Sequence, residues 1–155
     1  MVVTRTWAKL VDGFVEFSIS MSPEFLMLFF PQQDLSLNAE RCMTLGTIQH
    51  ELIHALGYDH MHNHIDRDNF IEIKLENVRD EKSFVKVDAL ATSNFGTTYD
   101  LLSVMHYNSK AFSKNGMHTI IPKDSKYLRK MGQRLRMSRG DVQRLNNMYQ
   151  CTKLN

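Results

Sequence analysis

The residues best suited to chemistry lie at positions 50–60, in the run H-E-L-I-H-A-L-G-Y-D-H. His50 and His54 are four residues apart, so on a helix their imidazoles lie on one face, one turn apart. Gly57 is the natural end of that helix, because glycine adopts a left-handed backbone at little cost, and the turn then brings His60 back to the other two. Three neutral nitrogen ligands and one open position are typical of a catalytic zinc site.

Glu51 follows the first histidine and is placed to act on a water held between the metal and its carboxylate. It would accept the proton of that water as a general base. The alternative is an ordinary amphipathic core helix with surface histidines. Its apolar positions would be Leu45, Ile48, Leu52, Ile53 and Leu56. Core packing does not require three histidines and a glutamate at these spacings, so we favour the zinc site.

Four other histidines need separate consideration. His62 and His64 lie close to His60 in the sequence, so either is a possible competitor for the metal. The spacing H-x-x-G-x-x-H selects His60, and we predict that the other two are loop histidines. His106 is a weaker candidate still, and no argument favours His118.

Residues 50–68 resemble the zinc-binding segment of the astacin family of zinc endopeptidases, within the metzincins. Residues 103–107, S-V-M-H-Y, are similar to that family's Met-turn with its tyrosine, and residues 131–151 to its C-terminal segment. The resemblance covers about residues 34–151 well and residues 1–33 poorly. It implies one α+β peptidase domain over residues 1–155, two-lobed, with an active-site helix, a small truncated N-terminal sheet and a C-terminal helix.

The resemblance also implies an activity, the hydrolysis of internal peptide bonds of proteins or peptides. One catalytic Zn²⁺ would be held by His50, His54 and His60. Tyr107 would be an additional ligand at rest and would move to the oxyanion during turnover, although it is also a possible core aromatic. Met105 would be a packed floor under the imidazoles, because its thioether suits an irregular gap.

Two departures from the family bear on this activity. The family usually carries a glutamate after the third histidine, where it anchors the mature N-terminus; here the position is Met61, so that latch is absent. Only 49 residues precede His50, several tens fewer than the family uses, and the usual substrate-binding edge strand is not recognisable in residues 16–30. A non-catalytic zinc-binding remnant is therefore an alternative, against which the intact Glu51 and Tyr107 count. A small structural zinc domain is a third interpretation and would need a fourth side-chain ligand.

Composition restricts the class of protein. The chain has 155 residues, 43% hydrophobic and 23% charged, which suits one globular domain. The formal charge of +2 suggests neither a nucleic-acid nor a membrane partner, and we expect the basic cluster at residues 123–139 to be a solvated surface. No apolar run approaches the roughly 20 residues of a membrane span. We expect a monomer that acts on protein or peptide substrates.

The family is typically secreted, so the resemblance implies an extracellular location. No signal peptide is visible at the start of the sequence. Two interpretations stay open, an incomplete chain or one that has lost its export route.

Local patterns predict the elements that position the site. Asn38 or a nearby residue would cap the zinc helix, which runs to Leu56. Ser138 begins an S-x-x-D capping signal for a C-terminal helix at residues 139–149. Residues 79–94 read as a loop with a short helix, and Asp12-Gly13 as a turn. Strands are predicted at residues 14–20, 25–30, 70–75 and 119–121.

Two cysteines remain, Cys42 and Cys151. In the resembled family each matches a member of a different disulfide, and neither partner is present here. We therefore predict two free thiols, with Cys42 buried on the zinc helix and Cys151 more exposed. Without both bridges the fold should be marginal and the peptidase activity weak.

Overall fold

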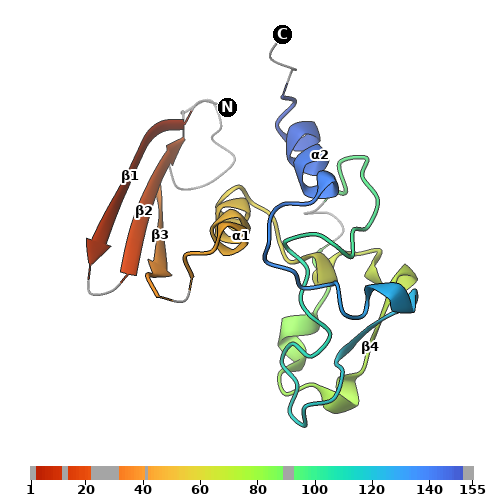
Figure 1. Cartoon of the computed structure of the whole chain (residues 1–155). Coiled ribbons are helices and arrows are strands. Elements are labelled where there is room, and N and C mark those ends of the chain that lie inside the picture. Colours follow the sequence, from red (N-terminus) through yellow and green to blue (C-terminus); the bar gives the residue numbers. More distant parts are fainter. Residues whose placement is uncertain (1–2, 12–13, 22–31, 41, 89–92, 152–155) are drawn as a thin grey trace.

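A three-stranded antiparallel sheet forms the N-terminal part of the fold. The structure is a computed structural model that describes residues 3–11, 14–21, 32–40, 42–88 and 93–151. The sheet has the order β1 (Val3–Val11), β2 (Phe14–Met21), β3 (Gln32–Asn38) (Figure 1). The predicted strand at residues 14–20 is confirmed as β2, whereas β1 and β3 were not predicted. The turn at Asp12-Gly13 and the predicted strand at residues 25–30 lie outside the described residues.

Helix α1 (Leu45–Ala55) follows the sheet and lies against β3 (Figure 1). Its N-cap is Thr44, whose side chain accepts a hydrogen bond from the Thr47 N–H. The cap was predicted at Asn38 or a nearby residue and lies six positions after Asn38, which ends β3 and accepts with its side chain from the Glu40 N–H. The predicted end is confirmed, since Leu56 is the C-cap and Gly57 has a φ of 89°.

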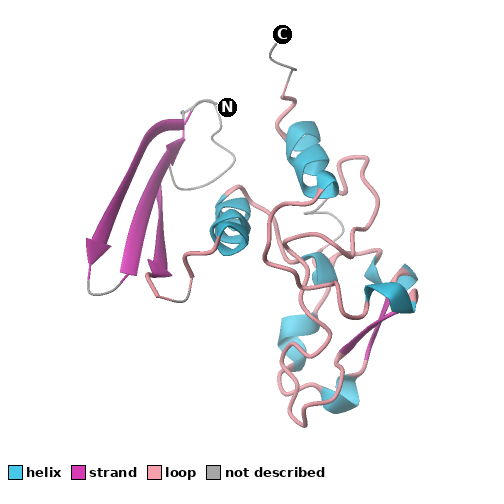
Figure 2. Ribbon diagram, in the orientation of Figure 1, coloured by secondary structure: helices cyan, strands magenta, loops and turns pink. Residues whose placement is uncertain are grey.

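The remaining chain is mostly loop with short elements (Figure 2). Strands β4 (Ile71–Ile73) and β5 (Ile120–Pro122) pair antiparallel. Both were predicted with longer or slightly shifted bounds, and Leu75 instead begins a 3-10 helix. The short helix expected in the loop at residues 79–94 is confirmed as η5, although residues 89–92 lie outside the described part. The 3-10 helices are η2 (Met61–Asn63), η3 (Arg67–Asn69), η4 (Leu75–Asn77), η5 (Glu81–Phe84) and η6 (Ser125–Tyr127).

Helix α2 (Arg139–Met148) closes the described chain. The predicted capping signal is confirmed as a capping box, in which the Ser138 and Asp141 side chains each accept from the other's backbone N–H. Val142 is 42% exposed, whereas the charged Asp141 and Arg144 are buried. Polar contacts to the loops therefore dock α2 as much as apolar packing does.

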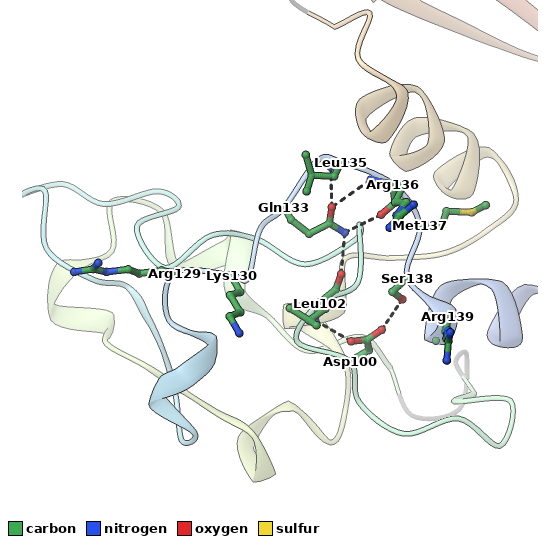
Figure 3. Close-up of a pocket in the computed structure, with 11 residues that line it drawn as sticks. Asp100, Leu102, Arg129, Lys130, Gln133, Leu135, Arg136, Met137, Ser138 and Arg139 are labelled. Atoms are coloured by element: carbon green, nitrogen blue, oxygen red, sulfur yellow. Dashed lines mark hydrogen bonds between the residues drawn. The ribbon is translucent and has the colours of Figure 1, made fainter.

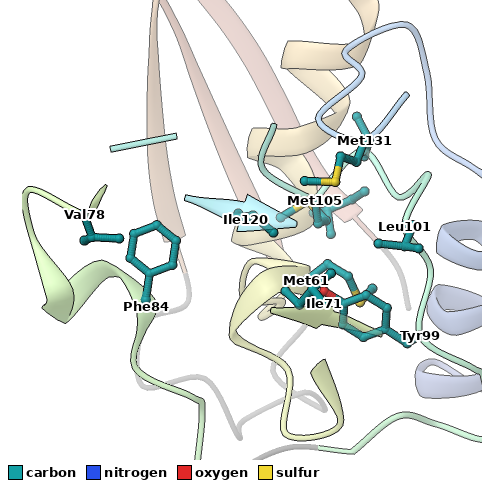
Figure 4. Close-up of a cluster of buried hydrophobic side chains, with 11 residues drawn as sticks. Met61, Ile71, Val78, Phe84, Tyr99, Leu101, Met105, Ile120 and Met131 are labelled. Atoms are coloured by element: carbon teal, nitrogen blue, oxygen red, sulfur yellow. The ribbon is translucent and has the colours of Figure 1, made fainter. Parts of the chain in front are cut away.

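The hydrophobic core lies beneath the loops of the C-terminal part (Figure 4). It joins the residue after the third histidine, Met61, to the Met-turn methionine, Met105. Its other buried members are Ile53, Ile71, Val78, Phe84, Tyr99, Leu101, Val104, Ile120 and Met131. Among the described helices, none has the length and apolar character needed to cross a bilayer.

Both cysteines are free, as predicted, and Cys151 is exposed. The predicted position of Cys42 is wrong. It precedes α1 and is only partly buried, because the helix begins three residues later at Leu45. Its backbone N–H donates to the Asn38 carbonyl at 2.9 Å.

Candidate metal centre and active site

Three histidine side chains converge on one point. The Nε2 atom of His54 lies 3.2 Å from Nε2 of His50 and 3.1 Å from Nε2 of His60. One ligand atom from each of the three lies within 4.8 Å of the others. The spacing of these residues predicted that they meet, and the described structure brings them together.

The other ring nitrogens explain why this cluster suits a cation. Nδ1 of His50 lies 2.8 Å from the Val104 carbonyl oxygen, and Nδ1 of His54 lies 2.6 Å from the Tyr58 carbonyl oxygen. A carbonyl only accepts, so each Nδ1 carries the proton and each Nε2 presents a lone pair. Lone pairs aimed at one another from about 3 Å repel, and a shared metal ion removes that repulsion. A carbonyl behind a ligating imidazole is also the usual way to fix its tautomer.

Burial keeps two of these imidazoles neutral. It lowers the pKa of His50 to about 4, and Arg134 and His54 act in the same direction. It lowers the pKa of His60 to about 3, helped by the neighbouring His54 and His62. Both are therefore unprotonated at neutral pH, which metal ligation requires.

A tight turn returns the third histidine to the helix. The Gly57 N–H donates to the His54 carbonyl at 2.8 Å, and the Tyr58 N–H to the Ile53 carbonyl at 3.2 Å. The N–H of Met61 then donates to the Met105 carbonyl at 3.0 Å, which ties the residue after His60 to the Met-turn. Met105 itself is buried, as a packed floor requires.

The Met-turn is held in turn by one buried carboxylate. Asp141 accepts from the Ser103 hydroxyl at 2.6 Å and from the Val104 N–H at 2.9 Å. A third bond, from the Ser138 N–H at 2.9 Å, caps α2. The Asp141 carboxylate thus holds the Val104 N–H, and the Val104 carbonyl in turn orients the ring of His50.

Glu51, Tyr107 and Arg134 lie within electrostatic reach of one another beside the histidines. Burial raises the pKa of the Tyr107 phenol, the guanidinium of Arg134 lowers it, and the carboxylate of Glu51 raises it. Arg134 donates to the His106 carbonyl at 3.1 Å. An acid, a phenol and a cation therefore lie near one another, and the ring of Tyr107 contacts that of His60 with centroids 4.3 Å apart.

Comparison with known proteins gives the family. Residues 29–150 match the family model described as Astacin, a family of peptidases. The chain belongs to the astacin family. Zinc metalloproteinase nas-14 of Caenorhabditis elegans is 43% identical over 121 residues, which are 77% of this chain and 24% of that protein. Seminal metalloprotease 1 of Drosophila melanogaster is 42% identical over 115 residues, 72% of this chain and 45% of the relative.

A solved structure agrees with this family. High choriolytic enzyme 1, a hatching enzyme zinc-protease of the medaka fish Oryzias latipes, aligns with a TM-score of 0.63 at 42% identity. The alignment covers 69% of this chain and 53% of that one. The predicted α+β astacin fold is confirmed, although the chain spans less than half the length of the two curated relatives above. A zinc cofactor follows from this family and from three histidines positioned to bind a metal ion.

His62 and His64 were predicted to be loop histidines and not ligands, and both lie outside the cluster of His50, His54 and His60. His62 lies in η2 and is fully buried, and its Nε2 bonds the Ser83 carbonyl at 3.0 Å. His64 is also buried. His106 uses both ring nitrogens, bonding the Tyr107 carbonyl at 2.7 Å and the Tyr99 hydroxyl at 2.8 Å. Within the described chain, none of these joins the metal cluster.

Two residues near the site were missed by sequence reasoning. The ring of His62 stacks on Tyr107 with centroids 4.1 Å apart and planes at 20°, so it holds the phenol in place. Arg134 was assigned to a solvated basic surface, yet it is partly buried beside the histidines. The other cations of that cluster are exposed, as expected. No periodicity marks Arg134; its contacts arise only when the loop folds back on α1.

Met61 occupies the position where astacins usually carry a glutamate. It is buried, and its sulfur accepts from the Arg144 guanidinium at 3.4 Å. The Nε of Arg144 also donates to the Thr97 hydroxyl at 3.0 Å. A neutral, weakly accepting side chain therefore stands here beside a buried cation, and the absence of the N-terminal latch stays a prediction.

Proposed function

We propose that this chain is a zinc-dependent metalloendopeptidase that hydrolyses internal peptide bonds of proteins or peptides. The observation that carries the proposal is the convergence of three histidine Nε2 atoms, with Glu51 next to His50 on the same helix. Membership of the astacin family supports it. The named relatives are a zinc metalloproteinase, a metalloprotease and a zinc-protease, which agrees with this chemistry.

His50, His54 and His60 would hold the metal through Nε2. Zinc, when bound, supplies a Lewis acid that lowers the pKa of a coordinated water to about 7 and polarises a carbonyl. The two backbone carbonyls behind His50 and His54 fix the tautomers that this binding needs.

Glu51 would accept the proton of the attacking water and then give it to the leaving amine. The Tyr107 hydroxyl would donate a hydrogen bond to the oxyanion of the tetrahedral intermediate. Before substrate binds, Tyr107 would be an additional metal ligand. Burial keeps the Tyr107 pKa above that of free tyrosine, so the phenol retains the proton that it donates. Arg134 lies close enough to influence both groups and adds positive potential where negative charge develops.

The substrate would be a protein or peptide in an extracellular setting, and we expect the enzyme to act as a monomer. A catalytically inactive zinc-binding remnant is not favoured, because Glu51 and Tyr107 are both present beside the histidines. A closed structural zinc site is also not favoured, since the described metal cluster has three ligands and leaves a position open.

The test is cleavage of a quenched fluorogenic peptide by the zinc-loaded chain. Glu51→Gln should keep one equivalent of zinc and lose about a hundred- to ten-thousandfold in kcat, because an amide cannot take up the proton. Glu76→Gln is the matched control, since Glu76 is an exposed carboxylate in η4. Absence of turnover by the zinc-loaded wild type would contradict the proposal, and loss of zinc by Glu51→Gln would contradict the role of Glu51.

Tyr107→Phe tests the oxyanion role separately. The variant should keep zinc and the stacking on His62, and should lower kcat by more than it raises KM, because the hydroxyl acts in the transition state. A change in KM alone would show that the phenol serves substrate binding instead.

A further inference from the structure

The ring of His62 forms a flat surface against the Tyr107 phenol. The two ring centroids are 4.1 Å apart and the planes are inclined by 20°, which is a stacked arrangement. His62 is fully buried, whereas Tyr107 is only partly buried and also contacts the ring of His60. His62 is not a member of the metal cluster in the described chain, so its burial beside the site needs another explanation.

Hydrogen bonds fix the plane of the His62 ring. Its Nε2 lies 3.0 Å from the Ser83 carbonyl oxygen, and because a carbonyl only accepts, Nε2 carries the proton. The Arg67 guanidinium donates to the His62 carbonyl at 3.1 Å and also to the Phe84 carbonyl. The Phe84 ring packs on the imidazole in a T-shaped arrangement, with centroids 5.4 Å apart. The imidazole is therefore anchored to η5 through its ring and its backbone.

The other ring nitrogen of His62, Nδ1, is buried and has no hydrogen-bond partner among the described residues. A buried acceptor of this kind lowers stability, and a phenylalanine would pack here without it. Phenylalanine has no N–H to donate to Ser83, however, so the plane of its ring would not be fixed. The histidine thus gives up some stability for a ring of defined orientation.

The charged neighbour of the phenol is also held in place. Arg134 lies within electrostatic reach of Tyr107. The loop that carries Arg134 is braced by the side chain of Gln133 (Figure 3). The Gln133 amide donates to the Leu102 carbonyl at 2.9 Å and to the Arg136 carbonyl at 2.8 Å. Because the surrounding groups are fixed, the ring contacts of Tyr107 decide where its hydroxyl lies.

We propose that His62 is a positioning residue, whose ring face sets where the Tyr107 hydroxyl meets the oxyanion of the tetrahedral intermediate. The inference rests on the proposed function, in which Tyr107 donates a hydrogen bond to that oxyanion. Aromatic pairs prefer offset stacking, so the phenol can slide across the imidazole without leaving its face. The phenol can thus move between the metal and the oxyanion while the plane of its ring stays fixed.

A double-mutant cycle between His62 and the Tyr107 hydroxyl tests the proposal in the zinc-loaded chain. His62→Leu keeps a buried apolar side chain but removes the flat ring. It should lower kcat for the fluorogenic peptide about five- to tenfold and change KM less than about twofold, because the hydroxyl acts in the transition state. In a Tyr107→Phe background the same substitution should change kcat less than about twofold, since no hydroxyl is left to position. Equal losses in both backgrounds would overturn the proposal.

Two further variants separate the ring face from general packing. His62→Phe restores an aromatic face and should recover kcat to within about threefold of the wild-type value. Phe70→Leu is the matched control, because it removes a ring stacked on Tyr99 with centroids 4.8 Å apart, and it should leave kcat within about twofold. If Phe70→Leu lowers kcat as much as His62→Leu, or if His62→Phe recovers nothing, the imidazole has no positioning role. His62→Gln, which lacks a ring, replaces His62→Leu with the same expectations if that variant does not fold.

Nuclear magnetic resonance of the metal-free protein tests the contact without turnover. The chain has five tyrosines, and Tyr107→Phe identifies the signals of Tyr107 in a sample with isotopically labelled tyrosine. Ring protons over the face of a stacked imidazole are shifted upfield. His62→Leu should return the Tyr107 signals toward those of an unstacked tyrosine, and Phe70→Leu should leave them in place. Unchanged Tyr107 signals in His62→Leu would overturn the proposal.

The outcomes also separate this inference from the proposed function. Absence of cleavage by the zinc-loaded wild type would contradict the peptidase activity, while the Tyr107 signals would still show whether His62 holds the phenol. Cleavage with equal losses in the two backgrounds would contradict the positioning role and leave the peptidase activity standing.

Discussion

Removal of the buried Asp141 carboxylate should weaken both the fold and the metal centre. The carboxylate accepts three hydrogen bonds, from the Ser103 hydroxyl and from the N–H groups of Val104 and Ser138. Hydrogen bonds to charged acceptors are worth about 1.5–3 kcal/mol each. At the lower end, Asp141→Ala should cost about 4 to 5 kcal/mol of unfolding free energy, a large share of the roughly 5–15 kcal/mol typical of a domain.

The metal centre should respond because the Val104 carbonyl orients His50 at 2.8 Å. With its N–H unpaired, the Val104 backbone can rotate, and the zinc affinity of the folded protein should fall about tenfold, as for other groups behind a ligand. Asp141→Asn should be milder, about 1 to 2 kcal/mol, because one oxygen still accepts both N–H groups and the amide can donate to the Ser103 hydroxyl.

Urea unfolding followed by circular dichroism measures the first effect, and competition with a chelator measures the second. Gln143→Ala is the control, since Gln143 is exposed on the same helix. If the free energy of unfolding of Asp141→Ala lies within about 1 kcal/mol of the wild-type value, the carboxylate does not anchor the Met-turn as we describe. If stability falls while the folded variant keeps full zinc affinity, the link through Val104 to His50 is wrong.

Three further predictions concern single residues. His60→Ala should lose the zinc that His62→Ala retains in metal analysis, because only the former belongs to the cluster; the opposite result would reassign the third ligand. Gly46→Ala should lower the free energy of unfolding by about 1–3 kcal/mol, despite alanine's better helix propensity, because its Cβ would collide with the Arg134 backbone; a stabilised variant would contradict that packing. Burial lowers the pKa of His106 from 6.5 to about 4, so between these two pH values the unfolded chain binds a proton there and the folded chain does not. The free energy of unfolding of the metal-free protein should therefore fall by about 2 to 3 kcal/mol as the pH is lowered from about 7 to 4.5. If His106→Gln shows the same dependence of stability on pH as the wild type, the prediction is wrong.

The sequence was most informative where the chemistry is local. His50, His54 and His60 belong to one helix and the turn that ends it, so spacing alone predicts that they meet. The capping box of α2 was equally readable, because it involves residues three positions apart. The cap of α1 was misplaced because Thr44 and Asn38 are both good caps, and only the end of β3 decides between them.

Long-range polar contacts were not predictable. Arg134 reaches the His106 carbonyl 28 residues away, and Asp141 reaches Val104 across 37 residues. Neither contact leaves a periodic trace: Arg134 was assigned to a solvated surface, and Asp141 was predicted only as part of the cap of α2. His62 was predicted only to be a loop histidine, and no sequence pattern indicated that the fold buries it against Tyr107.

These contacts give the C-terminal helix a role that its sequence does not suggest. Through Asp141, α2 holds the backbone that orients His50, the first ligand. Through Arg144, it holds Met61, directly after the third ligand. Helix α2 supplies no ligand of its own, yet it fixes both ends of the histidine set. Burial lowers the pKa of the Arg144 guanidinium, and the nearby Asp141 carboxylate opposes that shift. The geometry of the metal centre therefore depends on a helix that contributes none of its ligands.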